Sequence, residues 1–175
     1  MQVVDWKIII EKHGSIVWQT AYRLLGNHTD ASDCFQETFI CAFKVGQKQR
    51  IKNFPAFLSK LATTRAIDQL RKRFREAQNN TVNDYKEIVS HKNHDPANYI
   101  MKKELTLQLQ KELAKLPLTE AQVFCLRYLN DMSYRQIAKE LNIDTNTVGV
   151  FLYRAKEKLR KSFTALKNNK SEVIL

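Results

Sequence analysis

The sequence predicts an all-α protein built from two small helical bundles joined by a flexible linker, with a helix-turn-helix domain at the C-terminal end. Apolar residues recur every three or four positions along most of the chain, and no strand-like alternation appears. Only 4 Gly and 3 Pro occur among 175 residues, which disfavours folds rich in tight turns. The helical periodicity fails between about residues 77 and 98, where turn residues cluster.

We therefore expect an N-terminal domain at residues 1–76, a linker at 77–98 and a C-terminal domain at 99–175. The charge follows the same division, with 13 basic to 7 acidic side chains over residues 1–76 and 14 to 8 over residues 100–175. The whole chain carries a formal net charge of +11. A chain this basic usually binds a polyanion, most commonly nucleic acid, although a merely well-solvated basic protein is the alternative.

The first helix is predicted over residues 4–25, with Gly26 as its C-terminal stop. A second helix opens at Thr29 with acidic residues in its first turn, which the helix dipole favours. Its polar face is acidic and carries Asp30, Asp33, Gln36 and Glu37. An acidic face suits solvent or a docking protein better than DNA.

A third helix is predicted over residues 55–75, after a polar, basic connector at residues 46–53. Pro55 lies in its first turn, where the missing N–H costs nothing. The exposed side of this helix is strongly basic and carries Lys60, Arg65, Arg71, Lys72, Arg73 and Arg75. Such a surface is either a solvated helix end or a track for nucleic-acid phosphates.

The C-terminal domain is predicted to begin with a helix over residues 99–115, which Pro117 ends. A buried helix follows, and Thr119 with Gln122 forms a capping-box pattern at its start. Two further helices come next, separated by a turn at residues 142–143.

The first of these two helices has a capping-box start at Ser133 and Gln136 and one apolar stripe at Tyr134, Ile137, Ala138 and Leu141. The second starts after Asp144 and carries Val148, Leu152, Ala155 and Leu159 on one face. This is the helix-turn-helix pattern, whose second helix enters the DNA major groove. An ordinary helical hairpin is the alternative.

The three cysteines and four histidines show no metal-ligand spacing, so we expect neither a metal site nor a cofactor. Cys34, Cys41 and Cys125 each lie in an apolar helical pattern, where a free thiol acts as a small hydrophobe. No run of 18 apolar residues and no signal-peptide pattern is present, so we expect a cytoplasmic protein that does not insert into a membrane.

Three stretches resemble the extracytoplasmic-function (ECF) sigma factors. Residues 27–39 (NHTDASDCFQETF) resemble their acidic helix, and residues 54–73 (FPAFLSKLATTRAIDQLRKR) resemble their promoter-melting helix. Residues 116–159 resemble their C-terminal helix-turn-helix domain. The resemblance covers nearly the whole chain, and it implies a transcription initiation subunit that is not an enzyme.

The resemblance also implies partners and the residues that contact them. Core RNA polymerase would bind Asp30, Asp33, Gln36, Glu37 and Phe39. The −10 promoter element would be opened by Lys48, Arg50, Lys52, Asn53, Lys60, Thr64, Arg65, Asp68 and Arg71. The −35 element would be read by Thr145, Asn146, Val150 and Arg154, with phosphate contacts from Arg135, Lys139 and Lys156. Family members are often held by an anti-sigma factor, which we expect here too.

The chain departs from the family pattern at several positions. Phe57 stands where Trp is common, and Thr64 stands where Asn is frequent. Gly149, Val150 and Phe151 replace a basic residue, a Ser and an Arg. Two other functions fit parts of the sequence: a stand-alone regulator that binds palindromic DNA as a dimer, and a DNA enzyme such as a recombinase. The second would need a nucleophile or clustered carboxylates, which are not apparent.

Overall fold

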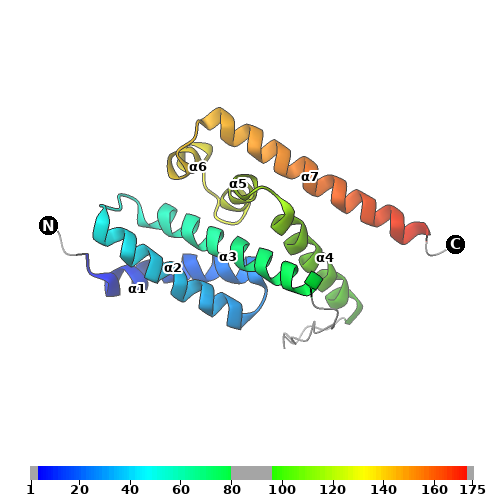
Figure 1. The fold of residues 1–175 in the computed structure, drawn as a ribbon, viewed down its shortest axis with the longest axis horizontal. Coiled ribbons are helices and arrows are strands. Elements are labelled where there is room, and N and C mark those ends of the chain that lie inside the picture. Colours follow the sequence, from blue (N-terminus) through cyan, green and yellow to red (C-terminus); the bar gives the residue numbers. More distant parts are fainter. Residues whose placement is uncertain (1–3, 80–95, 173–175) are drawn as a thin grey trace.

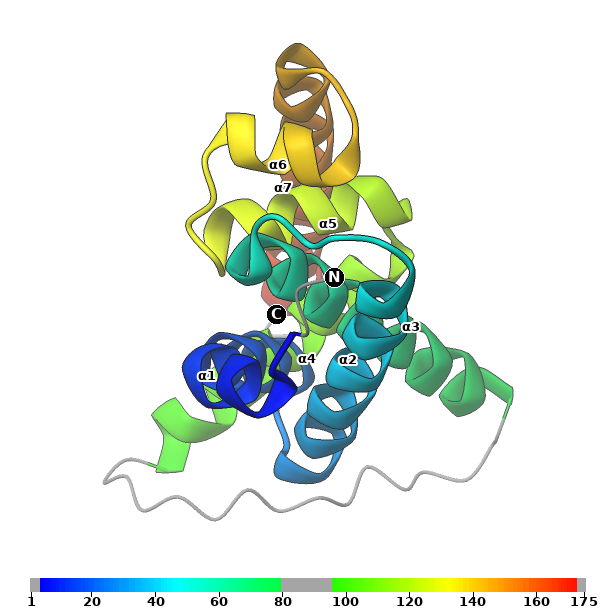
Figure 2. The ribbon, with the colours of Figure 1, turned by 90° about the vertical axis from the view of Figure 1, so that its left-hand side faces the viewer.

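The computed structural model describes residues 4–79 and 96–172, and within those ranges it contains seven α-helices and no strand. The helices are α1 (Trp6–Leu25), α2 (His28–Lys48), α3 (Phe54–Asn79), α4 (Pro96–Lys115), α5 (Leu118–Tyr128), α6 (Tyr134–Leu141) and α7 (Thr145–Glu172). Helix α3 lies between α1 and α2 on one side and α5 and α6 on the other (Figure 1, Figure 2). The predicted all-α class is confirmed.

The turn between α1 and α2 forms where the sequence predicts it. Gly26 has φ +75°, a left-handed conformation that glycine adopts without strain, and its N–H donates to the carbonyl of Tyr22. Asn27 then caps α2, because its side chain accepts a hydrogen bond from the backbone N–H of Asp30. Helix α2 continues to Lys48, further than expected, so residues 46–48 of the predicted connector are helical.

Gly46 lies against the indole of Trp6, and a Cβ at position 46 would come within 2.6 Å of Trp6 Cζ2. We expect Gly46→Ala to lower the free energy of unfolding by about 1–3 kcal/mol, because the indole must move. The matched control is Gly14→Ala, whose Cβ would meet Phe35 at an ordinary 3.5 Å. This control should be neutral or stabilising by up to about 1 kcal/mol. Urea denaturation distinguishes the two, and equal effects would contradict the packing argument.

Helix α3 is buried on two faces rather than one. Leu58 and Ala62 pack against Val17 and Phe39 of the first two helices. Ala56 packs in a separate cluster of the C-terminal helices, which includes Val123, Leu126, Ile137 and Val148. A third cluster joins both halves, with α3 contributing Ala66, Ile67 and Leu70 and with α1, α2, α4, α5 and α7 supplying the rest. The two predicted groups of helices therefore share a core.

The predicted helix-turn-helix is present. Ser133 and Gln136 form a capping box at the start of α6, and Asn142 ends the helix at φ +53°. The N–H of Val148 donates to the carbonyl of Asp144, so α7 begins directly after the turn. The capping box expected at Thr119 and Gln122 is wrong: Pro117 precedes α5 and no side chain caps it.

The predicted linker is shorter than residues 77–98, because α3 extends to Asn79 and α4 begins at Pro96. Both extensions lengthen amphipathic helices that pack against each other. The remaining predicted linker residues, 80–95, lie outside the described residues. Within the part of the chain that the structure describes, no helix is both long enough and apolar enough to cross a membrane.

Candidate nucleic-acid interface

The outer face of α2 presents the predicted acidic surface. Asp33, Gln36 and Glu37 are exposed on it. Ile40 continues the same face one turn later, and 55% of its surface is exposed. Ile40 is not among the predicted polymerase-binding residues, although its spacing of seven from Asp33 places both on one side of a helix. The outer face of α2 thus combines exposed carboxylates with an exposed apolar side chain, a combination that is typical of a protein-docking surface.

Asp30 and Phe39, which were predicted to contact the polymerase, both contact other residues of the chain, and only Phe39 is buried. Phe39 is only 7% exposed and packs with Val17 and Leu58. The carboxylate of Asp30 accepts hydrogen bonds from the side chains of Asn27 and Arg73, and Arg73 also donates to the carbonyl of Leu25 at the end of α1. In this structure both residues hold α2 in place rather than presenting a free side chain.

Part of the predicted −10 set lies in an exposed basic segment. Lys48 ends α2, and Arg50, Lys52 and Asn53 follow it, all exposed. The side-chain oxygen of Asn53 accepts a hydrogen bond from the N–H of Ala56 at 3.2 Å, so it also starts α3. The lysines and arginine have the charge and exposure that a phosphate contact needs.

Arg65 and Asp68 lie on the side of α3 near α2. A hydrogen bond with the Cys41 side chain, followed by the carboxylates of Glu37 and Asp68, raises the pKa of Arg65. Asp68 is exposed.

Three members of the −10 set instead contact the C-terminal helices. Lys60 Nζ donates to the carbonyl of Glu140 at 2.8 Å, and Arg71 donates to the carbonyl of Leu116 at 2.7 Å. Thr64 Oγ1 accepts a hydrogen bond from the Gln122 amide at 2.8 Å. This contact explains why Gln122 does not complete the expected capping box. None of these three side chains is free to meet nucleic acid in this conformation.

The predicted −35 residues are all exposed, on α6 and on the first half of α7: Arg135, Lys139, Thr145, Asn146, Val150, Arg154 and Lys156. Tyr153, 67% exposed, lies on the same face and was missed. Its position opposite the apolar stripe of Val148, Leu152 and Ala155 was the signal that could have found it.

The unusual residues at 149–151 have ordinary structural roles. Phe151 is half-buried against the cluster that contains Ile137 and Val148, so it fills part of the core. A Cβ at Gly149 would meet only the ring of Tyr134, at 3.8 Å, so the space does not require glycine. Val150 is 46% exposed and stays available for contact with a thymine methyl group.

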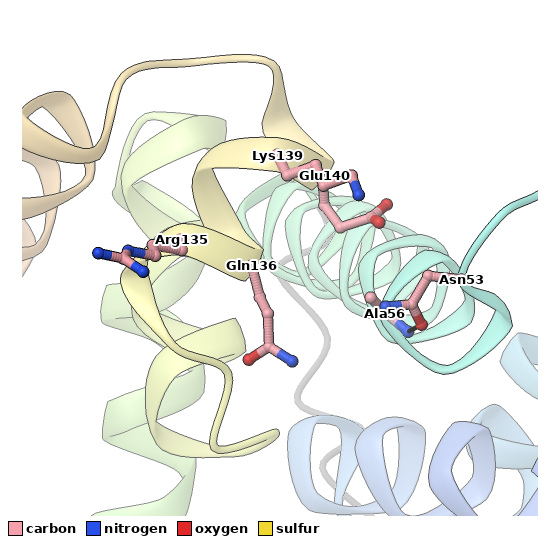
Figure 3. A pocket seen from close by; sticks show the side chains of 6 residues that line it. All are labelled: Asn53, Ala56, Arg135, Gln136, Lys139 and Glu140. Carbon is pink, nitrogen blue, oxygen red and sulfur yellow. Dashed lines mark hydrogen bonds between the residues drawn. The ribbon is translucent and has the colours of Figure 1, made fainter.

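The start of α3 and helix α6 face each other across a small open cleft (Figure 3). Its lining residues are Asn53, Ala56, Arg135, Gln136, Lys139 and Glu140. Figure 3 shows Arg135 pointing away from α3, whereas Gln136 and Glu140 extend toward the space beside it. The cleft thus brings a predicted −10 residue, Asn53, next to predicted −35 residues.

Two of the three cysteines, Cys34 and Cys125, are buried and act as packing residues. Burial raises the pKa of Cys34 to about 11 and that of Cys125 to about 12, so both thiols are protonated at neutral pH. Among the described residues, no group of three His, Cys, Asp or Glu side chains could hold a metal ion.

Two family profiles match the two halves of the chain. The profile described as Sigma-70 region 2 matches residues 9–76, and the profile described as Sigma-70, region 4 matches residues 106–159. The first match includes the acidic face of α2 and most of α3, and the second includes α5, α6 and the start of α7. The chain is thus of the sigma-70 type, with both of these regions.

The ECF RNA polymerase sigma factor SigW of Bacillus subtilis is 30% identical over 166 residues, which cover 90% of this chain and 88% of SigW. The ECF RNA polymerase sigma factor SigE of Mycolicibacterium smegmatis is 29% identical over 156 residues, and the match covers 89% of this chain but only 60% of SigE. The chain belongs to the ECF family of RNA polymerase sigma factors. These are alternative sigma factors, which direct promoter-specific transcription and are initiation factors rather than enzymes.

Two solved structures share the fold. The sigma factor RpoE of Bartonella quintana, solved with the anti-sigma factor NepR, superposes with a TM-score of 0.57 at 20% identity, covering 93% of this chain and 98% of RpoE. CnrH, solved with the cytosolic domain of CnrY, gives a TM-score of 0.58 at 19% identity, covering 91% of this chain and 88% of CnrH.

Proposed function

We propose that the chain binds core RNA polymerase through the outer face of α2, opens the −10 element with the connector and α3, and reads the −35 element with α6 and α7. The observation that carries this division of labour is the separation of charge on the surface. Carboxylates are exposed on α2, whereas exposed cations lie on the α2–α3 connector and on α6 and α7. A polymerase-docking face and two DNA-binding faces can therefore act without obstructing one another.

A run-off transcription assay tests this proposal. The purified chain is mixed with core polymerase and a set of promoter templates, including the template upstream of its own gene. We expect a discrete transcript from some templates, and none from core polymerase alone. Failure of the chain to bind core polymerase at low salt would refute the proposal. A palindromic footprint without polymerase would instead favour the dimeric regulator.

The exposed face of α7 should determine −35 preference. We expect Asn146→Ala and Val150→Ala each to relax discrimination at one −35 position by about 5- to 100-fold, because each removes a side chain that can contact a base edge. Lys156→Ala should weaken binding to all sequences alike and reduce the salt dependence. Binding to a panel of −35 duplexes separates these effects. Unchanged preference in both Ala variants would show that other residues read the element.

Tyr153→Phe is a matched variant on the same face. It keeps the ring and removes only the hydroxyl, so a loss of affinity would indicate a hydrogen bond from this hydroxyl to DNA, and unchanged affinity would exclude one.

We also propose an anti-sigma partner, a cytoplasmic location and the absence of any catalytic activity in the chain itself. Both solved relatives were determined with an anti-sigma factor or a partner's cytosolic domain. Helix α4 exposes Met101 at 65% and Leu105 at 58%, which a partner could cover. Native mass spectrometry of the chain isolated from unstressed cells should show a stoichiometric complex. A chain that is always free of any protein but polymerase would count against the partner.

A further inference from the structure

The connector between α2 and α3, residues 49–53, contains one half-buried side chain among exposed ones. Arg50 and Lys52 are exposed, whereas Ile51 between them is half-buried. Neighbouring side chains of an extended segment point to opposite sides, so an inward Ile51 leaves its two cationic neighbours pointing toward solvent. A contact that fixes Ile51 therefore also determines how these two members of the predicted −10 set are presented.

Trp6, the first residue of α1, contacts both helices that the connector joins. Its indole lies against Gly46 in the last turn of α2, where the Ile51 side chain also lies: a Cβ at position 46 would be 2.6 Å from Trp6 Cζ2 and 3.5 Å from Ile51 Cδ1. The indole also makes edge contacts with two rings, and its centroid lies 5.6 Å from that of Phe43 and 5.9 Å from that of Phe54, at the start of α3. In Figure 1, the start of α1 and the connector lie at the same end of the molecule.

Trp6 is fixed from its own side as well. The Asp5 carboxylate caps α1 by accepting hydrogen bonds from the N–H groups of Lys7 at 3.0 Å and Ile8 at 3.4 Å, which fixes the first turn around Trp6. Phe54 also stacks on His13 of α1, with 6.2 Å between the ring centroids and 9° between the ring planes. Helix α1 therefore contacts the start of α3 through two aromatic pairs.

We propose that Trp6 is a positioning residue for the −10 element: its indole keeps Ile51 inward and so fixes the two cations beside it for contact with the promoter strand. The proposal rests on the proposed function, which assigns the connector to the −10 element. Trp6 belongs to none of the predicted sites and need not touch DNA. Cations that are already in place lose less conformational freedom on binding than mobile ones do, so the fixed connector binds the strand more tightly.

Trypsin digestion of the free, full-length chain tests the positioning without polymerase. Trypsin cleaves after Lys and Arg, so it cleaves the connector at Arg50 and Lys52. We expect Trp6→Ala to speed this cleavage by about 5- to 50-fold, because the aromatic contacts that fix the connector are lost and it opens locally. Cleavage after Arg154, within α7, is the internal reference for unfolding of the whole chain.

Trp18→Ala is the matched control. It removes the second half-buried indole of the same helix. The rings that Trp18 contacts are Tyr22, His28 and Phe35, none of which borders the connector. Cleavage of the connector relative to α7 should therefore stay within about twofold of the rate in the unaltered chain. Equal acceleration in Trp6→Ala and Trp18→Ala would overturn the proposal.

The effect on DNA is measured with core polymerase and a single-stranded oligonucleotide that carries the −10 element of a promoter from the run-off assay. We expect Trp6→Ala to weaken binding of this oligonucleotide by about 5- to 50-fold, and Trp18→Ala to leave it unchanged. Affinity for a −35 duplex should be the same in both variants, whereas a loss of overall stability would reduce both DNA contacts. Trp6→Phe should restore most of the −10 binding, because a ring can still pair with Phe43 and Phe54.

A second substitution connects the effect to the packing at Gly46. Phenylalanine lacks the indole atoms Cζ2 and Cη2, which lie nearest to a Cβ at this position. Gly46→Ala should therefore speed connector cleavage in the unaltered chain, and by at least about threefold less in the Trp6→Phe background. Independent effects of the two substitutions would contradict the contact.

The outcomes separate the two proposals. If the unaltered chain initiates at no promoter with core polymerase, the proposed function is refuted. If it initiates and Trp6→Ala binds the −10 oligonucleotide equally well, the positioning role is refuted and the proposed function stands. Where Trp6→Ala does not fold, Ile51→Ala replaces it, because it removes the inward side chain and leaves α1 unaltered. Unchanged −10 binding in Ile51→Ala would refute the positioning role in the same way.

Discussion

Asp33→Lys is expected to weaken binding to core RNA polymerase by about 10- to 100-fold, because it places a like charge against a surface that an acidic face of α2 complements. Asp33 is exposed and its substitution breaks no contact within the fold. Affinity of the free chain for promoter DNA should be unchanged or slightly higher. Fluorescence anisotropy with labelled core polymerase and with labelled duplex measures the two affinities separately.

The matched control is Glu11→Lys, which makes the same kind of change in charge at an exposed position of α1. It should leave binding to polymerase intact. Asp30 is a poorer test, because its carboxylate is bound by Arg73 and Asn27 and its reversal would disturb the packing of α1, α2 and α3. Equal losses in Asp33→Lys and Glu11→Lys would mean that overall charge, rather than this face, governs docking.

Leu70→Ala is expected to lower the free energy of unfolding by about 2–5 kcal/mol, because it leaves a cavity at a fully buried position. Leu70 belongs to the cluster shared by both halves, so the loss should affect the whole chain. Both tryptophans lie in α1, whereas circular dichroism reports all the helices. The two signals should therefore follow one coincident thermal transition.

Leu105→Ala provides the comparison for Leu70→Ala. The chemical change is identical, but Leu105 is 58% exposed on α4, and its loss should change stability by no more than about 0.5 kcal/mol. Two separate transitions in Leu70→Ala, with only the tryptophan signal shifted, would show that the halves do not share a core in solution.

The two proposed DNA-binding surfaces differ in accessibility in this structure. The predicted −35 residues on α6 and α7 are exposed, whereas Lys60, Thr64 and Arg71 of the predicted −10 set form hydrogen bonds with the C-terminal half. We therefore expect duplex recognition to need less rearrangement than promoter opening. This order suits an initiation factor, since strand opening outside the polymerase would serve no purpose.

The sequence by itself determined the helices, their approximate ends and the family. Local signals suffice for these features, because helical periodicity, the Ser133–Gln136 capping box and Gly26 act over a few residues. The same periodicity placed the −35 residues on an exposed face, where the structure also has them. The same periodicity also places Ile40 and Tyr153 on exposed helix faces, but neither residue was included in a predicted site.

Only the tertiary structure decided which predicted site residues are available. Asp30, Phe39, Lys60, Thr64 and Arg71 all have partners that lie far from them in the sequence or across a helix turn. Helical periodicity shows that a side chain lies outside the main apolar stripe of its helix. It does not show whether a second helix packs against that side chain. Helix α3 has such a partner on each side, because Ala56, Ile67 and Leu70 meet the C-terminal helices while Leu58 and Ala62 meet α1 and α2. A contact between two distant helices depends on their relative placement, which no local pattern specifies.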